Sequence, residues 1–342
     1  MNHDTHEGHE TFRAPDSIRI RAHAKINLDL RVLGTRADGF HEMRTVFQAI
    51  ALYDTLTVVP RPGPFAIECT TAGVPIDPSN LIWKAAAALW RAARRSGELR
   101  DIVVRLEKQI PLQAGLGGGS GNAAAALIAL ARAWRLNVKP PQLTDVAMTL
   151  GADVPFFLSG GTALGLGRGE EIYPLTDLPR HWVVLLIPGF GVSTADAYGW
   201  YDDDRDSDRI VVREPQHVPG PWPSRAAQMI NDLEAPIARR HPEIDHMKAA
   251  LRRTGALAAA MSGSGSAVFG LFQRRAEAET AVATLGASGW GAVLTESLGR
   301  VEYARRSRPM TIKPALIKQA LFKQALSGSS GTRPLARKSR ID

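Results

Sequence analysis

Hydrophobic and polar residues alternate along several segments of the chain, and this two-residue period is typical of β-strands with one buried face. The longest such segment is Ile18–Leu33, which is also rich in β-forming residues. Gly34–His41 follows it and carries Gly, Asp and Gly, which predicts a loop or the end of a hairpin. Further strands are predicted at Thr55–Val59, Phe65–Thr70, Asp101–Lys108, Trp182–Ile187, Ala267–Phe272 and Ala292–Leu298.

Other segments repeat apolar residues every three or four positions, which predicts helices. These helices cover Leu81–Arg95, Asn122–Trp134, Thr144–Leu150, Arg225–His241, Ile244–Arg253 and Ala276–Leu285. Ser79 or Asn80 is expected to cap the first helix. Tyr201–Asp208 contains five aspartates and is predicted to be a solvated acidic loop. Because strands and helices mix without regular βα alternation, the pattern favours an α+β fold.

The same pass along the chain predicts its division into domains. Residues 1–15 are expected to be a disordered N-terminus. A first domain is predicted at residues 16–170 and a second at 171–306, because Gly-rich sequence near 160–180 precedes a new strand. Residues 307–342 are predicted to form a basic tail that includes a short helix.

A glycine-dense loop, Pro111–Asn122, is the strongest local signal of a binding site. It has glycine at positions 115 and 117–119 and runs directly into a helix with strong intrinsic propensity. Backbone amides can approach a ligand there without interference from Cβ atoms, and a helix N-terminus favours anions. The loop is therefore predicted to hold phosphate groups, the alternative being a tight helix entry with no ligand.

The loop does not match the common nucleotide-binding motifs. No Gly-Lys-Ser/Thr sequence follows the glycines, as a Walker A loop requires. The dinucleotide fingerprint needs glycine at position 120, where this chain has Ser120. The alternative that remains is an ATP-binding site of another type.

Two polar residues stand out in apolar surroundings. Lys25 lies within an apolar strand and shares its face with Asn27, two residues on. Asp153 enters an apolar segment before Pro155, which is costly for an acid unless it is paired. Lys25 would be a suitable partner, although a lone lysine in a strand is usually a solvated edge residue. A second Ser/Gly turn, within Met261–Phe272, is equally compatible with a purely structural role.

Composition indicates an ordinary globular protein. The chain has 342 residues, of which 44% are hydrophobic and 22% charged. A chain of this length can bury a hydrophobic core that is stable without disulfides or structural metals. The single cysteine, Cys69, excludes an intrachain disulfide and fits a reducing compartment, so a cytoplasmic location is expected. The apolar runs are far short of the ~20 residues of a membrane helix, and the first residues do not resemble a secretory signal.

The net charge of +8 is concentrated at one end of the chain. Residues 307–342 contain eight Lys or Arg and one acid, so this tail carries +7 and the preceding residues are nearly neutral. The pI of about 9.9 therefore reflects the basic tail, and it does not indicate that the rest of the chain binds nucleic acid. Neither a membrane nor a specific nucleic acid is expected as a partner, and the oligomeric state is left open.

Five segments, in order AHAKINLDL, RADGFHEM, PLQAGLGGGSGNAAAAL, GADVPFFLSGG and MSGSGSAVF, resemble the GHMP kinase superfamily. The similarity runs from about Ile18 to Val301. The glycine loop is shared across the superfamily. RADGFH and GADVPFF are more specific, and they are similar to the branch whose substrate is cytidine diphosphate methylerythritol.

The resemblance implies a fold and an activity. The fold would be a two-domain GHMP kinase, with an N-terminal domain like the second domain of ribosomal protein S5 and a ferredoxin-like C-terminal domain. The activity would be ATP-dependent phosphorylation, with Mg²⁺, of the 2-hydroxyl of the methylerythritol moiety in non-mevalonate isoprenoid biosynthesis. No protein-bound metal site is implied.

The resemblance also implies roles for individual residues. The catalytic pair maps onto Asp153, as general base, and Lys25. Cytidine recognition maps onto Asn27, Phe40 and His41, since an aromatic ring can stack on a base and a histidine can hydrogen-bond its edge. The ATP-binding residues would be Pro111, Leu112, Gln113, Ala114, Gly115, Leu116, Gly117, Gly118, Gly119, Ser120 and Gly121.

Three positions differ from the residues that are usual in this branch of the superfamily. Phe40 replaces the usual Tyr, Gly121 replaces a second Ser, and His23 stands where Pro is usual. The alternatives are another GHMP kinase, of homoserine or mevalonate type, and a non-catalytic nucleotide- or nucleic-acid-binding protein. The RADGFH segment argues against the first, and the presence of both Lys25 and Asp153 argues against the second.

Overall fold

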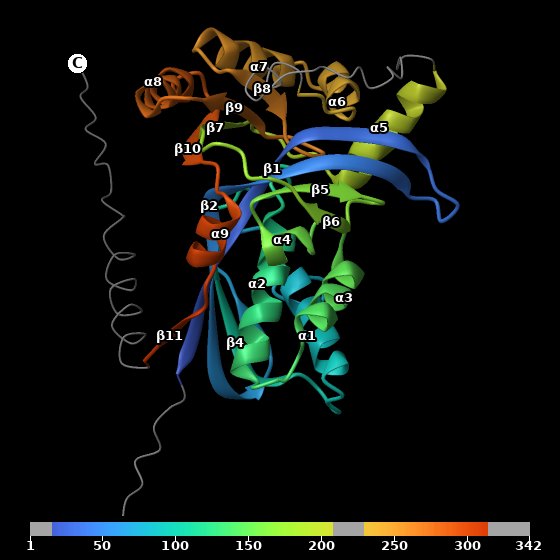
Figure 1. Cartoon of the computed structure of the whole chain (residues 1–342), viewed down its shortest axis with the longest axis vertical. Helices are drawn as coiled ribbons and strands as arrows, with labels where there is room; N and C mark the ends of the chain where they lie inside the picture. The colour runs from blue at the N-terminus through green and yellow to red at the C-terminus, as the bar shows by residue number, and fades with distance from the viewer. Residues whose placement is uncertain (1–15, 208–228, 314–342) are drawn as a thin grey trace, which may run out of the picture.

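The computed structural model describes residues 16–207 and 229–313, which form two β-sheets with helices packed on them (Figure 1). The predictions for residues 1–15, for the start of the helix predicted at 225–241, and for the tail beyond residue 313 fall outside the described residues. No helix within the described residues is long and apolar enough to cross a membrane.

The first sheet is built on a long antiparallel hairpin. Its main path runs β11-β1-β2-β4-β3, while β5 pairs with β2 and β6 pairs with β5. The strand predicted at Thr55–Val59 is the far part of β2, which is bent by a register irregularity against β1. The strands are β1 (Ser17–Thr35), β2 (His41–Pro64), β3 (Ala66–Glu68), β4 (Arg100–Glu107), β5 (Thr162–Leu166), β6 (Glu171–Pro174) and β11 (Met310–Ile312).

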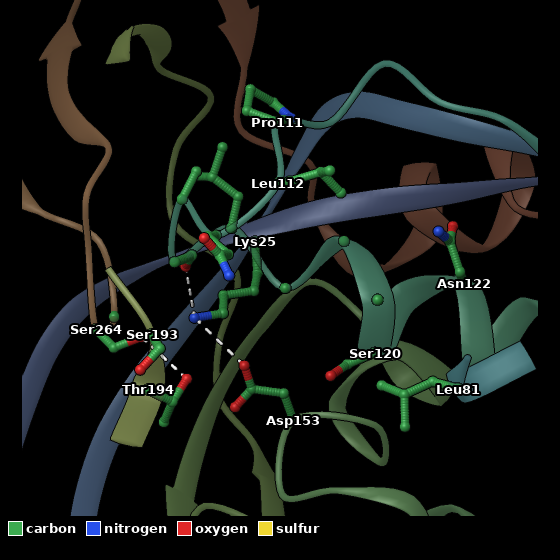
Figure 2. Close-up of a pocket in the computed structure, with 18 of the residues that line it drawn as sticks. Lys25, Leu81, Pro111, Leu112, Ser120, Asn122, Asp153, Ser193, Thr194 and Ser264 are labelled. Carbon is green, nitrogen blue, oxygen red and sulfur yellow. Dashed lines mark hydrogen bonds and ion pairs between the residues drawn. The ribbon is translucent and has the colours of Figure 1, made fainter. Parts of the chain in front are cut away.

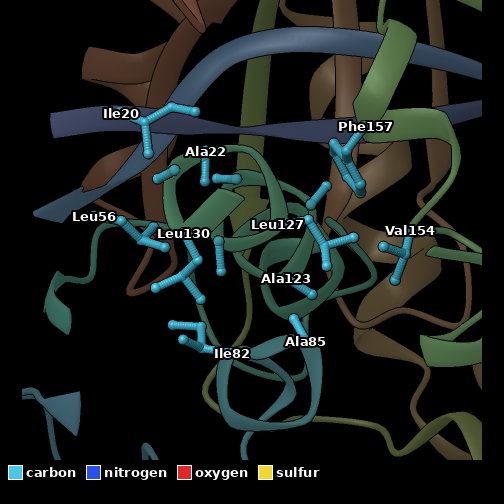
Figure 3. Packing of buried hydrophobic residues seen from close by; sticks show 14 of the residues in the cluster. Ile20, Ala22, Leu56, Ile82, Ala85, Ala123, Leu127, Leu130, Val154 and Phe157 are labelled. Atoms are coloured by element: carbon cyan, nitrogen blue, oxygen red, sulfur yellow. The ribbon is translucent and has the colours of Figure 1, made fainter. Parts of the chain in front are cut away.

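Helices cover one face of this sheet and close its core (Figures 1 and 3). Ile20 and Leu56 of the sheet pack with Leu127 and Leu130, all of them buried. Asn80 caps the first helix by accepting a hydrogen bond from the Ile82 amide, at 2.8 Å. The helices are α1 (Leu81–Ala92), α2 (Gly118–Ala133), α3 (Pro140–Leu150) and α4 (Phe156–Ser159).

The second sheet is antiparallel, in the order β10-β7-β9-β8, and has a core of its own. A third buried cluster, with Ile26, Leu116, Leu185 and Phe269, joins β1 and the glycine loop to this sheet. The elements are β7 (Trp182–Ile187), β8 (Ala258–Met261), β9 (Val268–Phe272), β10 (Gly291–Glu296), α5 (Thr194–Asp206), α6 (Glu234–Arg240), α7 (Glu243–Arg253) and α8 (Arg275–Gly286).

The acidic segment at Tyr201–Asp208 was predicted to be a loop, and this prediction is wrong: α5 runs through to Asp206. Ser193 caps the helix by accepting a hydrogen bond from the Asp196 amide, at 3.0 Å. Asp204 is buried and bonded to arginines of α6. Distant partners neutralise this charge, which local composition does not reveal.

The helix predicted at 225–241 begins later than expected, at Glu234 of α6. Residues before it follow the β1 backbone instead, because the Leu30 amide donates to Ile230 O (2.8 Å) and the Asp232 amide to Leu30 O (3.0 Å). These hydrogen bonds pair backbone amide and carbonyl groups that would pair within the helix if the helix began earlier. The segment therefore ties the second half of the chain to the long hairpin.

The end of the described chain returns to the first sheet. β11 pairs antiparallel with β1, with Ile312 opposite Ser17. Tyr303, on α9 (Arg300–Arg306), is buried in the core of the first sheet. The sequence predicts a second domain over 171–306 and a tail from 307, whereas β6, α9 and β11 all lie with the first sheet.

Candidate functional site

A cavity of about 530 Å³ opens where the glycine loop meets the long hairpin and the second sheet (Figure 2). Lys25, Asn27 and Asp153 line it, and so does every residue of Pro111–Ser120. The start of α5 adds Ser193 and Thr194. The structure thus brings together residues that lie more than 120 positions apart in the sequence.

Lys25 is held at the centre of this site by three oxygen atoms. Its side chain is 4% exposed, and its Nζ lies 3.4 Å from Asp153 Oδ2. Nζ also donates hydrogen bonds to Asn27 Oδ1 (2.6 Å) and to the carbonyl oxygen of Gly115 (2.9 Å). A buried ammonium group is tolerated only when it is paired in this way. Lys25 is therefore not a solvated strand-edge lysine.

Asp153 faces the cavity from the turn between α3 and α4. Its side chain is 31% exposed, so the carboxylate meets both the cavity and the buried Lys25 (Figure 2). The turn is closed by a 3.1 Å hydrogen bond from the Val154 amide to Gly151 O. A carboxylate placed in this way can accept a proton from a hydroxyl group that enters the cavity.

The glycine loop presents the N-terminus of α2 to the cavity. Gly117 precedes the helix with φ of 70°, and no side chain caps the first turn. A helix starting at Gly118 leaves its first amides without intrahelical partners, and their N–H groups and the helix dipole favour an anion. A Cβ atom on Gly117 would lie 2.7 Å from the ring of Phe157 and 3.0 Å from Lys25 Cγ, so glycine is required there.

The second Ser/Gly turn contacts this loop directly. Ser262 Oγ donates to Gly115 O at 3.0 Å. Gly263 has φ of +56°, and a Cβ there would lie 2.9 Å from Lys25 Nζ. Asn231, which sequence reasoning missed, donates from Nδ2 to the carbonyl oxygens of Met261 (2.9 Å) and Gly263 (2.7 Å). The turn thus holds the loop and Lys25 in place.

A second lysine lines the cavity and was also missed. Lys108 follows β4, and its Nζ donates to Asp54 Oδ2 at 2.8 Å. Asp54 is fully buried and accepts further bonds from the amides of Gln109 (2.7 Å) and Ile110 (2.8 Å). Lys108 Nζ lies 3.0 Å from the position of a Cβ on Gly118, so its ammonium group, paired with Asp54, lies beside the glycine loop.

The residues predicted for cytidine recognition are not all in one place. Asn27 lines the cavity and donates from Nδ2 to Thr45 Oγ1 at 2.7 Å. The His41 ring stacks on that of Tyr198, with centroids 4.8 Å apart, and of these two only Tyr198 lines the cavity. Phe40 is 55% exposed, does not line the cavity, and has the Arg168 guanidinium 5.1 Å from its ring.

Tyr198 is a cavity residue for which sequence reasoning gave no signal. Burial raises the pKa of its hydroxyl, and the negative charge of Asp153 raises that pKa further. The hydroxyl contacts the sulfur of Met43. The phenol therefore stays neutral and offers its ring face between the cavity and His41.

Gly121, predicted to bind ATP, does not line the cavity and is buried in the first turns of α2. A Cβ atom there would lie 2.8 Å from the carbonyl oxygen of His23. A side chain at this position would therefore require the backbone of β1 or α2 to shift. A role of Gly121 in contacting phosphate stays a prediction.

No group of three or more His, Cys, Asp or Glu side chains among residues 16–207 and 229–313 is arranged to hold a metal ion.

Comparisons with known proteins point to one family of kinases. A model of the N-terminal domain of GHMP kinases matches residues 80–161, and one of the GHMP kinase C-terminal domain matches 222–291. A 4-diphosphocytidyl-2-C-methyl-D-erythritol kinase of Solibacter usitatus is 44% identical over 275 residues, covering 78% of this chain and 85% of that protein. Its counterpart from Moorella thermoacetica is 42% identical over 271 residues, covering 78% and 93%. A crystal structure of a 4-(cytidine 5'-diphospho)-2C-methyl-D-erythritol kinase superposes with TM-score 0.66 and 34% identity, covering 82% and 99%.

Proposed function

This chain belongs to the 4-diphosphocytidyl-2-C-methyl-D-erythritol kinase family of GHMP kinases, and we propose that it transfers the γ-phosphoryl group of ATP to the 2-hydroxyl of that cytidine diphosphate compound. The reaction would supply the non-mevalonate route to isoprenoid precursors. The observation that carries the proposal is the Lys25–Asp153 pair, 3.4 Å apart, in the cavity that the glycine loop lines.

Asp153 acts as the general base in this proposal. Its carboxylate faces the cavity and accepts the proton of the attacking hydroxyl, a role worth roughly 10²–10⁴-fold in rate. Lys25 supplies fixed positive charge beside the carboxylate and near the path of the phosphoryl group. Because Asn27 and Gly115 O also hold its ammonium group, Lys25 needs little rearrangement during the reaction.

The glycine loop binds the phosphates of ATP. The amides of Gly118, Gly119 and Ser120 lie in the first turn of α2 and line the cavity, where they can donate to phosphate oxygens. The ammonium group of Lys108, which is paired with Asp54, lies beside them and can donate a hydrogen bond to a phosphate oxygen. ATP-binding residues are accordingly proposed along the whole loop, Pro111–Gly121.

The residues of the cavity fit a magnesium ion that arrives with ATP. Mg²⁺ prefers oxygen ligands and usually takes one or two from the protein and the others from phosphates and water. The Ser120 hydroxyl lies in the cavity at the start of α2, and it would hold the ion together with the ATP phosphates. The ion would neutralise phosphate charge during transfer.

The cytidine end of the substrate lies toward α5 in this proposal. Asn27 and Tyr198 line the cavity, and the ring of His41 stacks directly behind Tyr198. Phe40 lies next to His41 in the hairpin and exposes its ring, so it can close on a base from outside. A cytoplasmic location is proposed with this activity, because ATP is the donor and Cys69 is the sole cysteine.

Turnover by the purified protein tests the proposal. The protein is mixed with ATP and Mg²⁺ and offered 4-diphosphocytidyl-2-C-methyl-D-erythritol, homoserine or mevalonate, while ADP release is followed. We expect ADP release with the cytidine compound only, and ³¹P NMR should place the new phosphate on its 2-hydroxyl. ADP release with homoserine or mevalonate alone would assign another GHMP activity, and nucleotide binding without turnover would support a non-catalytic role.

A further inference from the structure

A β-bulge lies in β1 directly after Asn27, where the long hairpin passes the cavity. Asn27 pairs with Phe47 and Asp29 pairs with Val46, so β1 has one more residue than β2 across this step. A bulge interrupts the regular ladder and redirects the side chains beside it. The side chain redirected here is that of Asn27, which lines the cavity and accepts a hydrogen bond from Lys25.

Thr45 of β2 connects the bulge to Asn27. It is fully buried and does not line the cavity. Its hydroxyl donates a hydrogen bond to the carbonyl oxygen of Asp29 at 2.7 Å and accepts one from Asn27 Nδ2, also at 2.7 Å. Asn27 Oδ1 in turn accepts from Lys25 Nζ at 2.6 Å. A chain of three hydrogen bonds therefore runs from the backbone of the bulge to the ammonium group in the cavity.

These three hydrogen bonds can run in one direction only. A threonine hydroxyl has a single proton, and the proton of Thr45 goes to a carbonyl oxygen, which can only accept. The Thr45 oxygen must therefore accept from Asn27, so the amide turns its NH₂ group toward Thr45 and its oxygen toward Lys25. Lys25 needs this orientation, because an ammonium group can only donate.

Removal of the Thr45 hydroxyl would set two demands on the Asn27 amide against each other. Its NH₂ group would be buried without the Thr45 acceptor, and its oxygen would still be attracted to Lys25. The cost of a buried donor without a partner is comparable with the gain from a hydrogen bond to a charged group, so the amide would no longer keep one orientation. Lys25 would then lose a fixed acceptor, and transition-state stabilisation depends on charges that are already held in place.

We propose that Thr45 is a positioning residue for phosphoryl transfer: its hydroxyl fixes the Asn27 amide, which holds the ammonium group of Lys25 beside Asp153. This inference rests on the proposed function, because it takes Lys25 as a group that stabilises the transferred phosphoryl group. Thr45 lies outside the cavity, so it acts through Asn27 and not on the substrate. The bulge in β1 is thereby linked to the reacting groups through side chains that the sequence places on two strands.

Thr45→Val tests the proposal, because valine has nearly the shape of threonine and lacks the hydroxyl. Thr45→Ser keeps a hydroxyl at the same position and is the rescue variant. Thr57→Val is the matched control, since Thr57 is a buried threonine of the same strand and lies outside the cavity. The measurements are kcat with the cytidine substrate, KM for ATP and the melting temperature. If Thr45→Val does not fold, Thr45→Ala, which removes the same hydroxyl with less bulk, replaces it in every comparison.

We expect Thr45→Val to lower kcat by about fivefold or more and to leave KM for ATP unchanged. Thr45→Ser and Thr57→Val should keep the kcat of the wild type. In a chain that already carries Asn27→Ala, Thr45→Val should lower kcat no further, because its effect passes through Asn27. A purely structural role of Thr45 in closing the bulge would lower kcat equally in both backgrounds.

Three results would overturn the inference. The first is a wild-type kcat in folded Thr45→Val, and the second is a loss of kcat that is as large in Thr45→Ser. The third is an equal further loss when Thr45→Val is added to Asn27→Ala. Failure of the proposed function is a separate result, because it would appear as absence of turnover of the cytidine substrate by the wild type, before any variant is compared.

Discussion

His23 gives the chain a defined sensitivity to acid. Its side chain lies on β1 between the rings of Tyr53 and Tyr303, with centroids 5.4 and 5.6 Å away. Neither ring nitrogen has a hydrogen-bond partner among the described residues. Burial, together with the positive charges of Arg306 and Arg21, lowers the pKa of His23 from its usual 6.5 to about 4. Protonation of the imidazole is therefore strongly disfavoured in the folded chain.

The consequence for stability follows from the two pKa values. In the unfolded chain the pKa of a histidine is near 6.5, so between about pH 4 and pH 6.5 the unfolded state binds more protons at His23. The stabilisation is complete above pH 6.5 and is lost as the pH falls toward 4. A difference of about 2.5 pKa units corresponds to about 3 kcal/mol in full, of which about 2 kcal/mol is lost between pH 7.5 and pH 5.

The assay is urea unfolding of the wild type and of His23→Phe at pH 7.5 and pH 5. Phenylalanine keeps an aromatic ring between the two tyrosines and cannot be protonated. We expect the free energy of unfolding of the wild type to fall by about 2 kcal/mol more than that of His23→Phe. His246→Gln, at an exposed histidine, is the control and should behave as the wild type does. Parallel pH dependences in the wild type and His23→Phe would refute the reasoning.

Three further predictions concern catalysis, the base and the C-terminal strand. Lys25→Ala should lower kcat by roughly 10²-fold or more, because it removes the only ion-pair partner that the described residues give Asp153; an unchanged kcat in a folded variant would remove Lys25 from the mechanism. Phe40→Ala should raise KM for the cytidine substrate, because the loss of a base stack weakens binding by about 1–3 kcal/mol, and leave KM for ATP unchanged; the reverse pattern would place Phe40 at the ATP site. A chain ending at residue 306 lacks β11 and should melt a few degrees lower than one ending at 313, while equal melting temperatures would show that β11 adds no stability.

Local sequence patterns predicted the parts of the molecule that local chemistry determines. The α+β class and the two-domain GHMP kinase fold, which the family resemblance implied, are confirmed. The strand that carries Lys25 and the hairpin loop after it, which local patterns predicted, are confirmed as well. Lys25, Asp153 and the glycine loop, which meet in one cavity, could be predicted because each has a local signal: a charge in an apolar segment, or glycines before a helix. Their catalytic and binding roles stay predictions.

The parts that the sequence did not predict depend on distant partners. The acidic run in α5 was interpreted as a loop because its partners, His41 and the arginines of α6, are far away in the sequence. Lys108 ends a predicted strand and has no local signal of a site, since its buried partner Asp54 lies on another strand. The return of β11 to β1 likewise links the two ends of the described chain, over a distance that no short pattern spans.

The central claim is that Asp153 removes the proton of the attacking hydroxyl, and one comparison of kcat tests it most directly. Asp153→Asn is nearly isosteric and is compared with Asp145→Asn, which removes the same charge at an exposed position of α3. Calorimetric titration first establishes that both variants bind ATP and the cytidine substrate. We predict that kcat falls by roughly 10²–10⁴-fold in Asp153→Asn and stays unchanged in Asp145→Asn. A kcat equal to that of the wild type in a folded, substrate-binding Asp153→Asn would contradict the account.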